Sequence, residues 1–248
     1  MATSNQPAIP RYMKAAPHRP AGLKKYQDYL ASEAKLPTPP EILHRYEHVH
    51  RWPLDGNDIY GDCSMAAAAH AIHAWNIATR QSNPVPTTQE VLAEYFKVTN
   101  GADIPLQEAE VLKLWHRNGL WGHKILGYTP VDMGDIHLIK QATYLYGLAL
   151  VGVRLTKKSE HQFKLQQPWT LQRGWKSEPI VGGHAVPVIG YDPYHLYVVT
   201  WGRVQKMSFD WWHAYGDEAW AIFPSQLQED GGADHLRLDL LHVDLKNI

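Results

Sequence analysis

The chain has little that could crosslink it or hold a thiolate metal cluster, because Cys63 is the only cysteine in its 248 residues. An internal disulfide, a Cys-x-x-Cys redox pair and a cysteine zinc cluster are therefore all excluded. The chain also lacks a charge imbalance, with 25 acidic residues against 24 lysines and arginines. No global field then attracts nucleic acid or a membrane surface, and we expect neither as a partner.

Long apolar runs are also missing, so no segment is expected to insert into a membrane. Residues 1–7 lack the basic run and apolar core of a secretory signal, which predicts a cytoplasmic protein, with packaging in a virion as a second option. At 44% hydrophobic residues the chain can bury a substantial core in one large domain or two lobes.

Residues 1–55 contain eight prolines and are interpreted as an N-terminal arm with one short helix over residues 22–36. Such an arm could wrap the domain, cover a cleft as a propeptide does, or dock on a protein partner. A surface extension is the favoured alternative. We divide the remainder into a helical lobe, residues 56–147, and a β lobe, residues 148–248.

Histidines are frequent, and two groups have spacings that could serve a metal. His44, His48 and His50 lie close together in the arm, and His70 and His73 form an i, i+3 pair. No carboxylate completes a His-Glu-x-x-His pattern, and most histidines in a chain with 15 of them serve packing or the surface. We therefore expect no metal and no cofactor.

Cys63 stands at a change of sequence character, between a loop rich in glycine and aspartate and an alanine-rich segment. High helix propensity predicts a helix over residues 64–79, with Cys63 in its first turn. Free N–H groups and the helix dipole there favour a thiolate, whereas the neighbouring Asp62 disfavours one unless its side chain caps the helix. The alternative is an inert buried cysteine, which is common.

The remaining pattern is helical at first and β-rich later. Three further helices are expected. The first is capped by Thr87 or Thr88 and runs through Lys97, with Glu90 at the capping-box spacing from Thr87, and the others cover residues 106–118 and 135–146. Residues rich in β-formers then predict strands over 148–155, 185–191 and 196–201, joined by short turns into an antiparallel sheet. Residues 156–183 between the first two strands are interpreted as an excursion over a cleft. The fold class is therefore α+β.

A base for Cys63 is offered by His184, which follows two glycines at the start of a strand. A helical lobe with a cysteine, followed by a β lobe that opens with Gly-Gly-His-Ala-Val, resembles the papain-like cysteine peptidases. Asn57 lies six residues before Cys63 (63 − 57), at the position where that family has an oxyanion-binding glutamine. Residues 183–186 and 190–191 resemble the stretch around the family's histidine, and residues 200–202 resemble its Asn-Ser-Trp-Gly.

The resemblance implies a papain-like two-lobe fold and a distant, bacterial or phage-type member, because the family's Cys-Gly-Ser-Cys-Trp is absent. The family's orienting asparagine or aspartate falls on Val199 if Trp201 is aligned, or on Thr200 at sixteen residues from His184 (200 − 184). We expect Thr200 to face the imidazole and Val199 to point away, because side chains alternate along a strand. Asp192 is the alternative partner.

The leading interpretation is a thiol hydrolase, expected to be a peptidase, with Cys63 as nucleophile, His184 as base, Thr200 as orienting residue and Asn57 as oxyanion donor. Its partner would be a peptide or protein substrate. Amide transfer through the same acyl-enzyme is equally open. The alternative is a catalytically degenerate papain-like module, for example a virion or assembly component whose arm docks on its neighbours.

Overall fold

The computed structural model describes residues 14–31, 36–47, 49, 51–79, 83–229 and 233–248. These residues form a six-stranded antiparallel sheet in the order β1-β6-β2-β3-β4-β5, with helices packed against it. The strands are β1 (Ile125–Pro130), β2 (Ala149–Thr156), β3 (Ile180–Tyr191), β4 (His195–Thr200), β5 (Arg203–Ser208) and β6 (Gly216–Pro224). The sheet and its helices confirm the α+β class.

The helices vary from single turns to one long buried helix. They are η1 (Tyr26–Tyr29), α1 (Cys63–Thr79), α2 (Thr88–Val98), α3 (Glu108–Asn118), α4 (Ile136–Tyr146), α5 (Lys157–Lys164), η2 (Trp175–Ser177), α6 (Phe209–Tyr215), α7 (Gln226–Glu229) and α8 (Leu238–Lys246). Among the residues described, no helix combines the length and apolar character needed to cross a bilayer.

Local signals in the sequence explain the helix boundaries. Thr87 and Glu90 form the expected reciprocal capping box at the start of α2, and the Asp135 side chain accepts from the first N–H groups of α4. Gly147 ends α4 in the left-handed conformation, with a φ of 86°. The four helices predicted in the first part of the chain are therefore confirmed, to within two residues at their starts.

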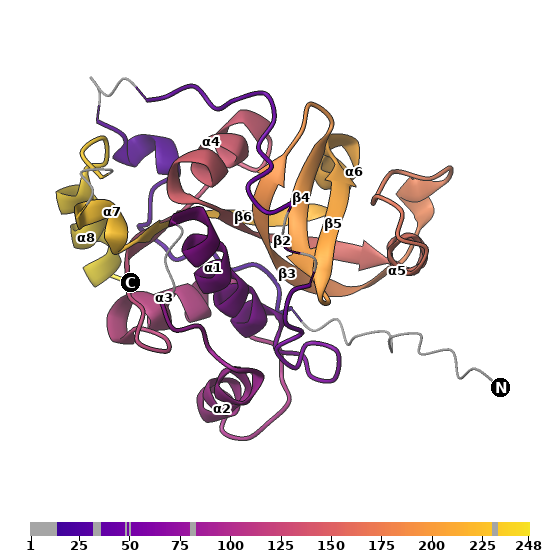
Figure 1. The fold of residues 1–248 in the computed structure, drawn as a ribbon, viewed down its shortest axis with the longest axis horizontal. Coiled ribbons are helices and arrows are strands. Elements are labelled where there is room, and N and C mark those ends of the chain that lie inside the picture. The colour runs from indigo at the N-terminus through magenta and orange to yellow at the C-terminus, as the bar shows by residue number, and fades with distance from the viewer. Residues whose placement is uncertain (1–13, 32–35, 48, 50, 80–82, 230–232) are drawn as a thin grey trace.

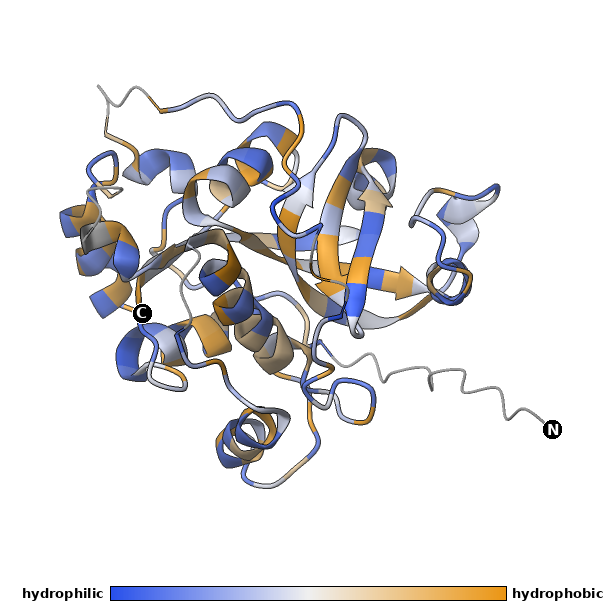
Figure 2. Cartoon of the chain, viewed as in Figure 1, coloured by the Kyte–Doolittle hydropathy of each residue, from blue (hydrophilic) through white to orange (hydrophobic). Residues whose placement is uncertain are grey.

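The long helix α1 is the central helical element. It packs against β3 through buried alanines. Because these side chains are small, the helix can approach the sheet closely. α3 and α8 pack on β1, α4 packs on β6 and β3, and α5 and α6 pack on β2. In Figure 1, α1, α2 and α3 lie together beside the strands, and Figure 2 shows hydrophobic segments both in the strands and in the helices. The N-terminus of α1 is thereby held against the middle of the sheet.

The structure corrects three expectations. The helix expected over residues 22–36 is only the single turn η1, because Tyr26 and Tyr29 are buried in the core and Leu30 pairs with Leu236; residues 32–35 lie outside the described residues. Tertiary pairing therefore prevails over local helix propensity. The first lobe is also not purely helical, since β1 pairs with β6.

The third correction concerns residues 156–183, which were expected to form an excursion over a cleft. They contain α5 and η2, and Trp169 is buried against the edge of β5, where its backbone bonds Lys206 and Ser208. A large indole gains more from burial in the core than from a surface position. The segment thus extends the sheet side of the molecule.

Candidate functional site

Cys63 is the first residue of α1 and is almost completely buried, at 1% exposure. Its sulfur lies beside β3, where the Ala185 N–H donates to it. Burial raises the pKa of the thiol to about 12, against the effect of that hydrogen bond. Asp62 and Glu108 raise it further when they are ionised. In this arrangement Cys63 is a neutral thiol at neutral pH.

His184 directly precedes Ala185 on β3 and is also only 1% exposed. Its Nε2 lies 2.7 Å from Thr200 Oγ1, and its ring stacks on Trp201 with 4.5 Å between centroids and 15° between planes. The other ring nitrogen, Nδ1, is buried and has no hydrogen-bond partner among the described residues. Burial lowers the pKa of His184 to about 3, so the ring is neutral at neutral pH.

Thr200 ends β4 and reaches the imidazole because β3 and β4 are antiparallel neighbours joined by a short turn. The contact expected between Thr200 and His184 is thus present in the structure. Asp192, the alternative partner, is not at the imidazole. Its carboxylate accepts from the backbone N–H of Tyr194 and His195 and from the Tyr197 hydroxyl, which fixes the turn.

Asn57, expected as the oxyanion donor, is buried in the loop before α1. Its Nδ2 donates to Asp62 Oδ1 at 3.1 Å and to the Tyr60 carbonyl at 3.4 Å, so both amide hydrogens have protein acceptors. Asp62 therefore does not cap the helix with its side chain. Burial raises the pKa of Asp62 to about 8, despite the bond from Asn57, so its carboxyl is largely protonated at neutral pH.

A charged cluster next to these residues was missed by the sequence analysis. The Lys14 ammonium, only 1% exposed, lies 2.6 Å from Glu218 Oε1 and 3.2 Å from Asp217 Oδ1. Glu108, at the start of α3, is buried within electrostatic range of Lys14. These four residues come from three distant segments and form no motif, so no signal in the sequence could have brought them together.

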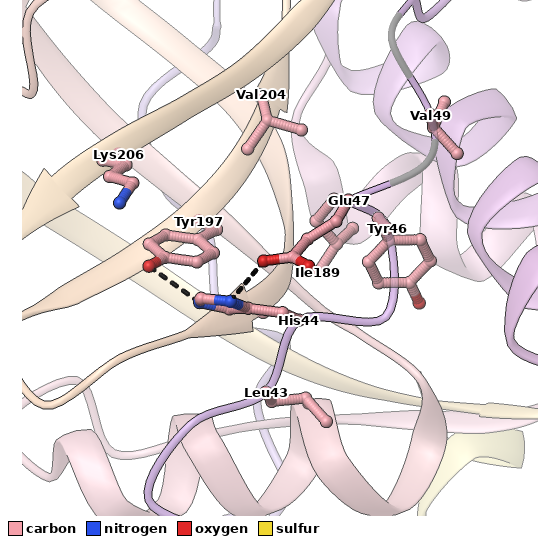
Figure 3. Close-up of a pocket in the computed structure, with 10 residues that line it drawn as sticks. Leu43, His44, Tyr46, Glu47, Val49, Ile189, Tyr197, Val204 and Lys206 are labelled. Atoms are coloured by element: carbon pink, nitrogen blue, oxygen red, sulfur yellow. Dashed lines mark hydrogen bonds and ion pairs between the residues drawn. The ribbon is translucent and has the colours of Figure 1, made fainter.

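A separate cavity of about 240 Å³ lies between residues 43–47, with Val49, and the strands β3, β4 and β5. Figure 3 shows His44 there between Tyr197 and Glu47, with His44 Nε2 2.9 Å from the Tyr197 hydroxyl. Its lining includes neither Cys63 nor His184.

The histidines considered for a metal have other contacts. His70 Nε2 lies 2.8 Å from the Pro53 carbonyl, and His73 packs near Trp52, while His48 and His50 lie outside the described residues. Within the part of the chain that the structure describes, no group of three or more His, Cys, Asp or Glu side chains is arranged to hold a metal.

The fold is that of the papain-like cysteine proteases. No protein-family profile and no curated protein matches the sequence, whereas solved structures match the fold. Xylellain, a cysteine protease from Xylella fastidiosa, superposes with a TM-score of 0.66 at 16% identity, over 90% of this chain and 99% of that one.

Two other structures agree with this comparison. The cysteine protease and lectin-like domains of Cwp84 from Clostridium difficile give a TM-score of 0.59 at 10% identity, over 86% of this chain and 55% of that one. A structure from work on the mite allergens Blo t 1 and Der p 1 gives 0.53 at 13% identity, over 82% and 75%. At these identities the likeness establishes the fold, and the chemistry must be argued from the residues.

Proposed function

We propose that the protein is a papain-like cysteine peptidase that acts through an acyl-enzyme. The observation that carries the proposal is the state of the His184 ring. Its Nε2 is hydrogen-bonded to Thr200, and its Nδ1 is buried without a hydrogen-bond partner among the described residues. His184 lies on β3, the strand whose Ala185 contacts Cys63. A buried polar atom without a partner is costly, and a proton donor at this nitrogen would satisfy it.

The proposed roles follow from this geometry. With the Nε2–H donating to Thr200 Oγ1, the Nδ1 lone pair is available to take the proton of the Cys63 thiol. The sulfur then attacks a peptide carbonyl, and the Cys63 N–H with the Asn57 amide would stabilise the oxyanion. His184 returns the proton to the leaving amine, and water, activated by the same imidazole, releases the acyl group.

One observation favours the second candidate, a degenerate papain-like module. Burial holds Cys63 and His184 in their neutral forms, with pKa values of about 12 and about 3, so neither is activated in this state. A catalytic role therefore requires the site to become hydrated or charged on substrate entry, whereas an inert module requires no such change.

A thiol-reactive probe separates the two candidates. We expect iodoacetamide to label Cys63 at pH 7 in the wild type and more slowly in His184→Ala, because the imidazole no longer accepts the proton. Hydrolysis of a mixed peptide library, followed by mass spectrometry, should be lost in both Cys63→Ala and His184→Ala. Inertness to the probe, with no cleaved peptide, would establish the module instead.

A further inference from the structure

The Lys14 cluster lies directly beside the proposed catalytic residues. The Lys14 backbone N–H donates to the Gly183 carbonyl at 3.1 Å, and Gly183 immediately precedes His184. The charges of Lys14 and Glu108 both act on the Cys63 thiol. This backbone hydrogen bond therefore places Lys14 against β3, one residue from His184 and on the strand that also contacts Cys63.

The pocket that receives the Lys14 side chain contains three carboxyl groups for one ammonium, and burial together with the charge of Glu218 raises the pKa of Glu108 well above its ordinary value. Glu218 and Asp217 from β6 contact the ammonium, and Glu108 approaches from α3. Neither Glu108 oxygen has a hydrogen-bond partner among the described residues. The carboxyl groups of Glu108 and Glu218 are buried and that of Asp217 is half-buried, and all three face one cation. Such a site is destabilised when the cation leaves, and the Glu108 oxygens remain as unused acceptors when it is present.

Two glycines make room for the lysine. A Cβ at Gly152 would lie 2.8 Å from Lys14 Cε and 2.5 Å from Asp217 Oδ1, so a side chain there would block the pocket. A Cβ at Gly183 would lie 3.1 Å from both the Cβ and the carbonyl oxygen of Lys14. The stem and the backbone of the lysine therefore fit closely against strands β2 and β3.

The acidic side chains are also held in place. Glu218 Oε2 accepts from the Trp220 indole at 2.9 Å, which leaves Oε1 directed at the ammonium. Asp217 and Glu218 also line a cavity of about 270 Å³ that is shared with Pro17 and Trp220. The pocket is thus preorganised on one side and bordered by open space on another.

We propose that Glu108, Asp217, Glu218 and Gly152 form a subsite that recognises the lysine side chain of a peptide in the catalytic cleft, and that Lys14 occupies it as an intramolecular competitor. The substrate specificity rests on the proposed peptidase function, but recognition of a lysine does not depend on the chemistry of Cys63.

Binding tests the subsite without catalysis. In the full chain carrying Cys63→Ala and Lys14→Ala, calorimetry would compare short acetylated peptide amides that differ only by lysine or norleucine. We expect the lysine peptide to bind at least about tenfold more tightly, because a hydrogen bond between charged groups is stronger than one between neutral groups. Adding Glu218→Gln should remove the difference. Equal affinities for the two peptides would overturn the proposal.

A second measurement tests the subsite even if the Lys14→Ala variant is unstable or does not fold. n-Butylammonium, which matches the lysine side chain, should raise the Tm of this variant or restore its folding, whereas n-butanol should not. The same effect should be absent when Glu218→Gln is added. Failure of n-butylammonium to stabilise the variant contradicts the subsite.

Activity distinguishes the two proposals. The probe is a peptidyl acyloxymethyl ketone with lysine at the first or second residue from the reactive group. With Cys63 intact, it should label Lys14→Ala faster than it labels the wild type. The norleucine analogue of the probe should label Lys14→Ala more slowly than the lysine probe does. Peptide turnover without a lysine preference would remove the subsite and leave the peptidase. A lysine preference in binding without turnover would retain the subsite and remove the peptidase.

Discussion

His184 Nε2 lies 2.7 Å from the hydroxyl of Thr200, the last residue of the neighbouring strand β4. The hydroxyl fixes the ring orientation and can accept the Nε2–H. It has no formal charge and no second acceptor atom with which to stabilise an imidazolium. If His184 is the base, as proposed, its ring is oriented by Thr200 but the imidazolium gains no stabilisation from a neighbouring charge on that residue.

The first prediction concerns this contact. Thr200→Val removes the acceptor while keeping the side-chain volume, and we expect it to lower kcat by about 2- to 10-fold, the scale of one neutral hydrogen bond. Thr200→Asn should raise kcat, because an amide oxygen is a better acceptor for the imidazole. Steady-state hydrolysis of a cleaved library peptide measures both. An unchanged rate in Thr200→Val would show that the hydroxyl does not support catalysis.

The second prediction concerns Asn57. If its amide turns from Asp62 to the oxyanion during reaction, Asn57→Ala should lower kcat by about 10²-fold, the scale for losing one oxyanion donor. Iodoacetamide labelling of Cys63 should persist, because the thiol and its base are untouched. Loss of labelling together with turnover would assign Asn57 to holding the loop in shape.

The third prediction concerns Asp62, whose pKa burial raises from 3.8 to about 8. Since the folded state binds this proton more tightly than the unfolded chain, the stabilisation is complete below pH 4 and is lost as the pH rises towards 8. Asp62→Asn keeps an acceptor for Asn57 but cannot ionise. We expect the variant to gain stability relative to the wild type across this range, on the order of a few kcal/mol at pH 8.

Urea unfolding of both proteins at several pH values measures this difference. The two buried histidines, His70 and His184, have lowered pKa values, so the folded state loses stability as the pH falls below 6.5. Because both proteins contain these histidines, their contribution cancels when the free energies of unfolding are compared. A constant difference between pH 4 and pH 8 would show that Asp62 titrates normally.

Local patterns predicted much of the site. The alanine run after Cys63 predicted α1, and the sixteen-residue spacing across a tight turn predicted that Thr200 meets His184. Both depend on short-range rules, helix propensity and strand alternation. The donor direction of Asn57 could not be predicted, because it depends on the protonation and burial of its neighbour Asp62.

Long-range pairings were outside the reach of these rules. β1 contains a glycine and ends in proline, and its strand character depends on β6, almost a hundred residues later. Lys14 is an ordinary basic residue in the sequence, and only the fold surrounds it with Glu108, Asp217 and Glu218. Its burial shows that this part of the arm packs into the domain.

The last prediction tests how firmly the arm is joined to the domain. Leu43 and Tyr191 exchange two backbone hydrogen bonds, of 2.9 and 3.1 Å, at the end of β3. The neighbouring Gly190 has no side chain to separate them, and a Cβ there would lie 2.4 Å from the Leu43 carbonyl oxygen. Because this obstacle is backbone, it cannot move aside as a flexible side chain would, and the 41–47 segment must shift.

We therefore expect Gly190→Ala to lower the free energy of unfolding by about 1–3 kcal/mol, the cost of leaving buried backbone groups unpaired. Gly134→Ala is the matched control, since its Cβ would meet only Asp132 Oδ1, at 3.4 Å, and its effect should stay within about 0.5 kcal/mol. Urea denaturation followed by tryptophan fluorescence measures both. If Gly190→Ala and the wild type had the same free energy of unfolding, residues 41–47 would contribute little to the stability of the core, in spite of the buried Leu43 and Tyr46.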